Sequence, residues 1–151
     1  MYSPAKYRQL AQLCERRKSV GERRLLQLRR ERHAIDAERE RLQRKIDLLV
    51  ETGRVDRLDG KIAGRGELFD WLRKDASLRH RTQMLRFDLG QSDERASECD
   101  RRIDGQREIC RVLEEKRERY TDARRRANAR LLRIQMNLEE SELEERKSWS
   151  T

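Results

Sequence analysis

Residues 51–66 read ETGRVDRLDGKIAGRG and contain four of the seven glycines in the chain, at positions 53, 60, 64 and 66. Glycine adopts turn conformations that other residues avoid, so a cluster of this kind interrupts regular structure. The single proline is Pro4, so no proline ring breaks a helix on either side of the segment. The stretch therefore predicts a turn between two long helices.

Columns of residues spaced by seven flank this turn. The first block has one mostly apolar column: Tyr7, Cys14, Gly21, Leu28, Ile35, Leu42 and Leu49. Its companion column, which begins at Leu10, is mainly charged, and Leu25 and Ile46 partly replace it one position later. The second block has two columns: Leu89, Ala96, Ile103, Cys110, Arg117, Arg124, Leu131 and Leu138; and Leu78, Leu85, Ser92, Cys99, Gln106, Leu113, Tyr120, Ala127, Ile134 and Ser141. A repeat of seven over many turns is typical of a left-handed coiled coil.

We therefore predict an all-α fold: a long antiparallel two-helix coiled-coil hairpin with unequal arms, formed as a single unit by residues 1–151. The expected helices cover 4–50 and 67–145, with the glycine-rich turn at 51–66 and a short tail at 146–151. Gly90, followed by Ser92, could divide the second helix and make the arms equal, but we expect that helix to be continuous.

The composition excludes several classes of protein. The chain has 38 Lys and Arg against 29 Asp and Glu, a net charge of +9, and only 34% hydrophobic residues. This is too little apolar material for the compact core of an ordinary enzyme domain. No stretch free of charge is longer than Gln9–Cys14, whereas a membrane span needs about 20 apolar residues. The first ten residues, MYSPAKYRQL, lack the apolar core of a signal peptide, so a cytoplasmic location is expected.

The residues that usually carry chemistry do not form a catalytic or metal-binding pattern. His33 and His80 lie outside the apolar columns, on the expected outer faces of their helices. The three cysteines fall on the columns, which predicts small buried residues that stay reduced and bind no metal. The glycine segment does not match a phosphate-binding loop, because Lys61 is followed by Ile62 instead of a hydroxyl residue. We expect neither an enzyme nor a bound cofactor.

Two groups of residues are candidates for binding partner proteins. The first is basic and lies near the two chain ends: Arg16, Arg17, Arg23, Arg24, Arg124, Arg125, Arg126 and Arg130. The second follows the turn and is apolar: Leu68, Phe69, Trp71 and Leu72. A seam between two helices cannot cover so many large side chains, so some should be exposed, as at partner-binding surfaces.

Two segments carry a resemblance to a known family. They are Glu67–Lys74, with the sequence ELFDWLRK, and the ending Arg130–Glu145, with the sequence RLLRIQMNLEESELEE. With the hairpin pattern, they resemble the central stalk family of type III secretion ATPases, of the YscO and InvI type with the flagellar relative FliJ. The resemblance implies a hairpin set in the pore of a hexameric secretion ATPase and linked to the cytoplasmic ring of the export gate. Some members also hold secretion chaperones.

The resemblance also implies roles for the two groups. The arginines would face the ATPase, and Leu68, Phe69, Trp71 and Leu72 would face the export gate. The protein would be a virulence-associated injectisome component, cytoplasmic and peripheral to the inner-membrane secretion apparatus, with no small-molecule substrate and no membrane insertion.

Two alternatives remain open at the level of sequence. One is a basic coiled-coil adaptor that binds RNA or ribosomes, because Arg-rich stretches can contact phosphates. The interleaved acidic residues and the scarcity of aromatic side chains for base stacking make nucleic acid the less expected partner. The other is a structural homodimer whose chains pair in parallel.

Overall fold

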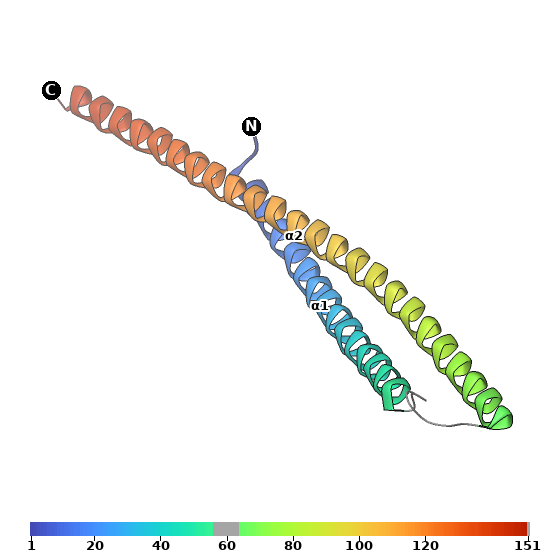
Figure 1. The fold of residues 1–151 in the computed structure, drawn as a ribbon. Helices are drawn as coiled ribbons and strands as arrows, with labels where there is room; N and C mark the ends of the chain where they lie inside the picture. The colour runs from blue at the N-terminus through green and yellow to red at the C-terminus, as the bar shows by residue number, and fades with distance from the viewer. Residues whose placement is uncertain (56–63, 151) are drawn as a thin grey trace. The chain divides into compact units, whose positions relative to one another are not determined.

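The computed structural model describes residues 1–55 and 64–150, which form two long α-helices (Figure 1). Helix α1 covers Pro4–Val55 and α2 covers Arg65–Trp149. The described residues contain no strand, which confirms the expected all-α fold. In those same residues, neither helix has an apolar stretch of the length that crossing a membrane requires.

Helix α1 starts where the sequence predicts and ends later. The backbone N–H of Lys6 donates a hydrogen bond of 3.3 Å to Oγ of Ser3, which caps the helix, and Pro4 occupies its first position. The expected end at residue 50 was wrong, because the helix continues to Val55. One helical glycine, Gly53, costs only about 1 kcal/mol, and Arg54 in the last turn is favourable to the helix dipole.

Helix α2 is longer than predicted at both ends. It begins at Arg65 instead of 67, with Glu67 in its first turn, where a negative charge is favourable. It passes through Gly90 without a break, which confirms the expected continuity. It ends at Trp149 instead of 145, because Arg146 and Lys147 suit the carboxyl end of a helix. The rest of the predicted turn, including Gly60, lies outside the described residues.

The chain divides into two compact units. We call Leu26–Asp104 the central unit. Met1–Leu25 and Gly105–Thr151 together form the terminal unit. Each unit contains a part of α1 and a part of α2.

The helices of the central unit are antiparallel. Arg32 lies 2.9 Å from Asp100, and Arg39, seven residues later in α1, lies 2.7 Å from Asp93, seven residues earlier in α2. The same register brings Val55, the last residue of α1, level with Ser77. About three turns of α2 therefore precede the point where α1 begins to cover it.

The core of the central unit combines large side chains of α1 with mostly small ones of α2. The buried residues are Leu28, Leu42 and Ile46 from α1, and Ser92, Ala96, Cys99 and Ile103 from α2. Ser92 is completely buried, and Arg95 donates a hydrogen bond of 3.3 Å to its hydroxyl. The thiol of Cys99 donates to the carbonyl oxygen of Leu28 at 3.3 Å, which links the two helices directly.

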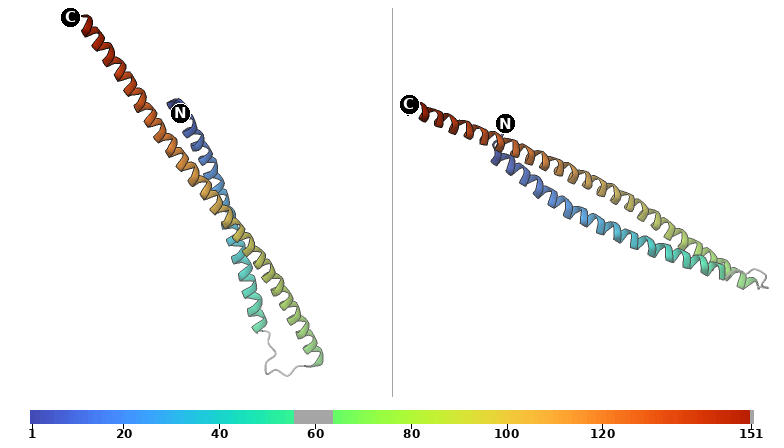
Figure 2. Two further views of the ribbon diagram at one scale, coloured as in Figure 1. Left: turned by 90° about the horizontal axis from the view of Figure 1, so that it is seen from above. Right: turned by 90° about the vertical axis from the view of Figure 1, so that its left-hand side faces the viewer.

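The terminal unit has a thinner core and keeps the same antiparallel register. Lys18 lies 3.0 Å from Glu114, and Glu15, three residues earlier, lies 3.3 Å from Arg117, three residues later. Its buried residues are small: Cys14, Gly21 and Ala127. Beyond Ala127 every described residue of α2 is exposed, and Figure 2 shows this part of α2 continuing past the start of α1.

Candidate functional site

A ladder of ion pairs runs along one edge of the helix pair in each unit. On α1 it follows the column Ala11, Lys18, Leu25, Arg32, Arg39 and Ile46, all buried or half-buried. The observed column lies one residue later than the column predicted to begin at Leu10. The predicted members Arg17 and Arg24 are exposed. Lys18, Arg32 and Arg39 of this column each face an acid of α2. We call each such position a rung of the ladder. Ion pairs occupy these rungs, and apolar residues occupy the other positions of the column.

The ladder is densest around Glu114 in the terminal unit. Arg117 donates to its carboxylate with two bonds, of 2.6 and 3.1 Å, and Lys18 lies 3.0 Å from it. These hydrogen bonds, first from Arg117 and then from Lys18, lower the pKa of Glu114 to about 2. The bond to Glu114 also raises the pKa of Lys18. Opposite charges thus join the two helices where the apolar seam is thin.

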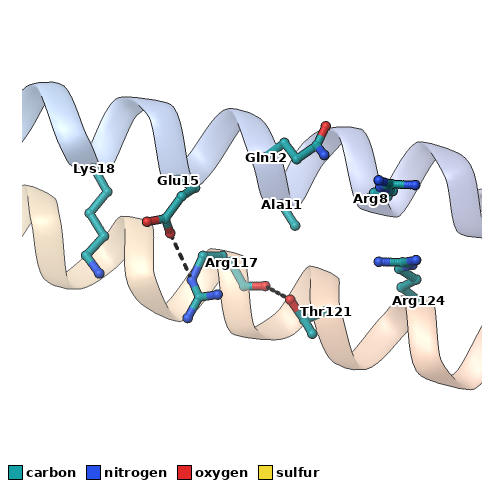
Figure 3. A pocket seen from close by; sticks show the side chains of 8 residues that line it. All are labelled: Arg8, Ala11, Gln12, Glu15, Lys18, Arg117, Thr121 and Arg124. Carbon is teal, nitrogen blue, oxygen red and sulfur yellow. Dashed lines mark hydrogen bonds and ion pairs between the residues drawn. The ribbon is translucent and has the colours of Figure 1, made fainter.

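A hollow of about 340 Å³ opens beside this cluster. It is lined by Arg8, Ala11, Gln12, Glu15, Lys18, Arg117, Thr121 and Arg124 (Figure 3). Arg8 projects from α1 and Arg124 from α2, and both side chains lie at the same end of the hollow. Glu15 is the only acid in the lining, and it binds Arg117.

All eight arginines of the predicted basic group belong to the terminal unit. Seven of them are exposed, and Arg124 is half-buried in the hollow. Arg125 lies 3.8 Å from Asp122, and the guanidinium of Arg130 donates to Sδ of Met1. Arg8 was not predicted as part of this group, although it precedes Glu15 by the same seven residues that separate Arg117 from Arg124.

The exposed end of α2 carries a second feature. It bears seven large apolar side chains, each more than half exposed: Leu131, Leu132, Ile134, Met136, Leu138, Leu143 and Trp149. Leu131 and Leu138 continue the heptad column of the seam beyond the residues that α1 covers. This segment therefore offers seam residues to a partner.

The predicted apolar group beside the turn is also largely exposed. Leu68, Phe69 and Leu72 have 44, 55 and 47% of their surface exposed, and Trp71 is half-buried. The antiparallel register explains this exposure, because these residues precede the point where α1 begins to cover α2.

A groove of about 520 Å³ in the central unit was not predicted from the sequence. Its lining is Lys45, Leu48 and Leu49 from α1 and His80, Arg81, Met84 and Leu85 from α2. Leu48 is 68% exposed and Met84 52%. Helical spacing places Phe69, Met84 and the exposed Phe87 on one side of α2, the same side as the groove. The sequence contains a signal for this groove, because the apolar residues Leu48 and Met84 lie outside the heptad columns.

The described residues show no arrangement suited to holding a metal. They contain no group of three or more His, Cys, Asp or Glu side chains that could bind an ion. All three cysteines are free thiols: Cys14 and Cys99 are buried, and Cys110 is half-buried. Burial, reinforced by Glu31 and Asp100, raises the pKa of the Cys99 thiol, which keeps it protonated. The features described above are suited to contacts with other proteins.

Comparison with known proteins adds one finding. The model of a family described as Salmonella surface presentation of antigen gene type M protein matches residues 5–147, which include nearly all of both helices. Comparisons with curated proteins and with solved structures gave no match.

Proposed function

The chain belongs to the Salmonella surface presentation of antigen type M family of type III secretion proteins, of the InvI and YscO type, and we propose that it is a central stalk. In this role it couples a hexameric secretion ATPase to the cytoplasmic ring of the export gate, with secretion chaperones as further partners. It works in the cytoplasm, at the periphery of the inner-membrane apparatus. The observation that carries the proposal is the part of α2 after Ala127, which is wholly exposed next to a basic helix pair.

The terminal unit supplies the end that engages the ATPase. Its exposed arginines can bind acidic side chains on several subunits of a ring without a pocket that matches the ring's symmetry. An exposed ion pair contributes only about 0.2–1 kcal/mol, so this grip depends on several arginines together. Because such pairs are screened by ions, the grip weakens as salt rises.

The central unit supplies the end that engages the export gate. Leu68, Phe69 and Leu72 are exposed near the start of α2, and the apolar groove lies farther along the same helix, where Lys45 and Arg81 contribute positive charge. An apolar groove between two helices can accept the apolar face of a third helix. Gate and ATPase therefore bind different units of the same chain.

The decisive experiment measures stimulation of the secretion ATPase at low salt. We expect the triple variant Arg124→Glu, Arg125→Glu and Arg126→Glu to abolish stimulation and keep its helix content. Single Arg→Ala changes should be nearly silent. The matched control is Arg29→Glu, Arg30→Glu and Arg41→Glu, three exposed arginines of the central unit. Equal effects of the two triple variants, or stimulation that survives the first, would contradict the proposal. RNA binding that falls steeply with salt, without ATPase binding, would favour an adaptor instead.

The gate end has its own test. Phe69→Ala combined with Met84→Ala should weaken binding to the export-gate ring and leave ATPase stimulation unchanged. Val20→Ala, at an exposed apolar residue of the terminal unit, is the control for loss of apolar surface. Trp71→Ala should weaken gate binding too, and a loss of helix content in that variant would show that Trp71 only packs.

A further inference from the structure

The inter-helix ion pairs of this hairpin obey a rule with one exception. At five rungs of the described residues a cation of one helix faces an acid of the other: Arg32 with Asp100, Arg39 with Asp93, Arg95 with Glu38, Lys18 with Glu114, and Arg117 with Glu15. Seven residues before Glu15 in α1 stands Arg8, and seven residues after Arg117 in α2 stands Arg124. The register of the two helices therefore places the cations Arg8 and Arg124 at the same rung.

No acid of the chain neutralises this pair among the described residues. One turn away from Arg8 along α1 are Pro4, Ala5, Ala11 and Gln12; one turn away from Arg124 along α2 are Tyr120, Thr121, Ala127 and Asn128. None of these carries a negative charge. Arg8 also lies near the start of α1, where the helix dipole adds positive potential. The hollow of Figure 3 gives open space beside both guanidinium groups.

We propose that Arg8 and Arg124 together bind one oxyanion, and that a carboxylate of a partner protein supplies it. A guanidinium group donates two parallel hydrogen bonds to a carboxylate or a phosphate, so two groups at the same rung can hold a single anion between them. At the other five rungs this chain meets its inter-helix cations with carboxylates. An Asp or Glu side chain from outside completes the ladder at the rung of Arg8 and Arg124.

The source of the carboxylate rests on the proposed function, since Arg124 belongs to the end that engages the ATPase. The oxyanion site itself is a property of the isolated chain. A free phosphate group has the same chemistry and is the competing source. The experiments below separate the site from its occupant.

The first measurement is a double-mutant cycle on the thermal unfolding midpoint of the full chain. Arg8→Glu and Arg124→Glu should each create an opposite-charge rung and raise the midpoint by about 1–3 °C at low salt. The double variant should lose this gain, because two acids then face one another. If the gain came only from a negative charge near the start of α1, Arg8→Glu would raise the unfolding midpoint and Arg124→Glu would not. Absence of coupling in the cycle would overturn the proposal.

The second measurement uses inorganic phosphate as the probe, exchanged for chloride at constant ionic strength. Phosphate should raise the midpoint of the unaltered chain and lose this effect in Arg8→Glu. Lys116→Glu, which makes the same charge change at an exposed residue outside the hollow, should keep it. An equal response of all three proteins would show that no oxyanion site exists.

The third measurement identifies the source of the anion. Arg8→Glu should bind the secretion ATPase about tenfold more weakly at low salt, a change of 1.4 kcal/mol, while Lys116→Glu binds normally. Normal binding by Arg8→Glu, with the phosphate response lost, would assign the site to a free anion and overturn the partner carboxylate. If the unaltered chain does not bind the ATPase at all, the proposed function fails, while the first two measurements still decide the oxyanion site.

Discussion

The central and terminal units use the same helices and the same register but different means of holding them together. In the central unit, the large side chains of Leu28, Leu42 and Ile46 are buried, together with Ala96 and other small residues of α2. In the terminal unit no large side chain is buried, and charge pairs around Glu114 bridge the helices. Burial therefore stabilises the central unit most. The terminal unit leaves its charges and apolar side chains available to partners.

The two units also differ in which helix contributes the small residues. In the central unit α2 is small, with Ser92 and Ala96 in the seam. In the terminal unit the smallest buried residue, Gly21, lies on α1. A methyl group added at Gly21 would lie 2.8 Å from Nε2 of Gln106 and 2.9 Å from Sγ of Cys110. Close helix contact thus depends on α2 in one unit and on α1 in the other.

The largest expected effect tests the difference in burial. Ile46→Ala should reduce the free energy of unfolding by about 2–3 kcal/mol, because it empties a site that is only 4% exposed. Leu113→Ala, at a half-buried residue of the terminal unit, should cost about 1 kcal/mol. Urea unfolding followed by far-UV circular dichroism measures both. Equal costs would show that the two units are held together in the same way.

The second test concerns the close approach at Gly21. Gly21→Leu should cost about 1–3 kcal/mol, since the larger side chain forces the helices apart. Gly21→Ala should be nearly neutral, because a gain in helix propensity of about 1 kcal/mol offsets the crowding by Gln106 and Cys110. The same urea experiment measures both. A stabilising Gly21→Leu would show that the helices are not in close contact there.

Most of the fold could be predicted from the sequence because the heptad repeat and the glycine cluster are local patterns. Cys14, Gly21, Leu28 and Leu42 of the first column and the small residues Ala96 and Cys99 are buried as the repeat indicates, and Ile35 is half-buried. The end of α1 was misplaced because the glycine cluster was read as one turn, whereas Gly53 is helical. A single glycine lowers helix stability without ending a helix.

The candidate sites were only partly predictable, because they depend on the register between the helices. The exposure of Phe69 and Leu72 could be expected from their number and size alone. The rung of Arg8 and Arg124 and the groove at Leu48 and Met84 could not be. Each joins residues that are far apart in the sequence, and a one-residue displacement of the column at Leu10 changes which side chains meet.

The third test asks whether solvent-facing glycines behave alike in both units. Gly90 lies in the central unit and Gly105 in the terminal unit, both within α2, and a methyl group added at either would meet nothing within 4 Å. Each Gly→Ala change should therefore stabilise the protein by about 0.8–1 kcal/mol through helix propensity alone. Thermal and urea unfolding measure the gain. A gain at only one position would show that α2 is not equally helical in the two units.

The smallest effect concerns the charge pairs of the terminal unit and their dependence on pH. The pKa of Glu114 falls from the ordinary 4.5 to about 2, because Arg117 and then Lys18 donate hydrogen bonds to the carboxylate. A carboxylate whose pKa is lowered by folding stabilises the protein above its unfolded pKa, and that contribution is lost as pH falls through its folded pKa.

Glu114→Gln removes this titration. Its unfolding midpoint should lie below that of the unaltered chain at neutral pH, and the difference should shrink as pH falls from about 5 to 2. Glu144→Gln, in the exposed part of α2, should follow the unaltered chain throughout. Addition of salt should reduce the difference at neutral pH, because Glu114 is partly open to solvent and its pairs are screened. Coincident curves for Glu114→Gln and the unaltered chain would mean that ion pairs do not hold the terminal unit together, and that its thin apolar seam does so alone.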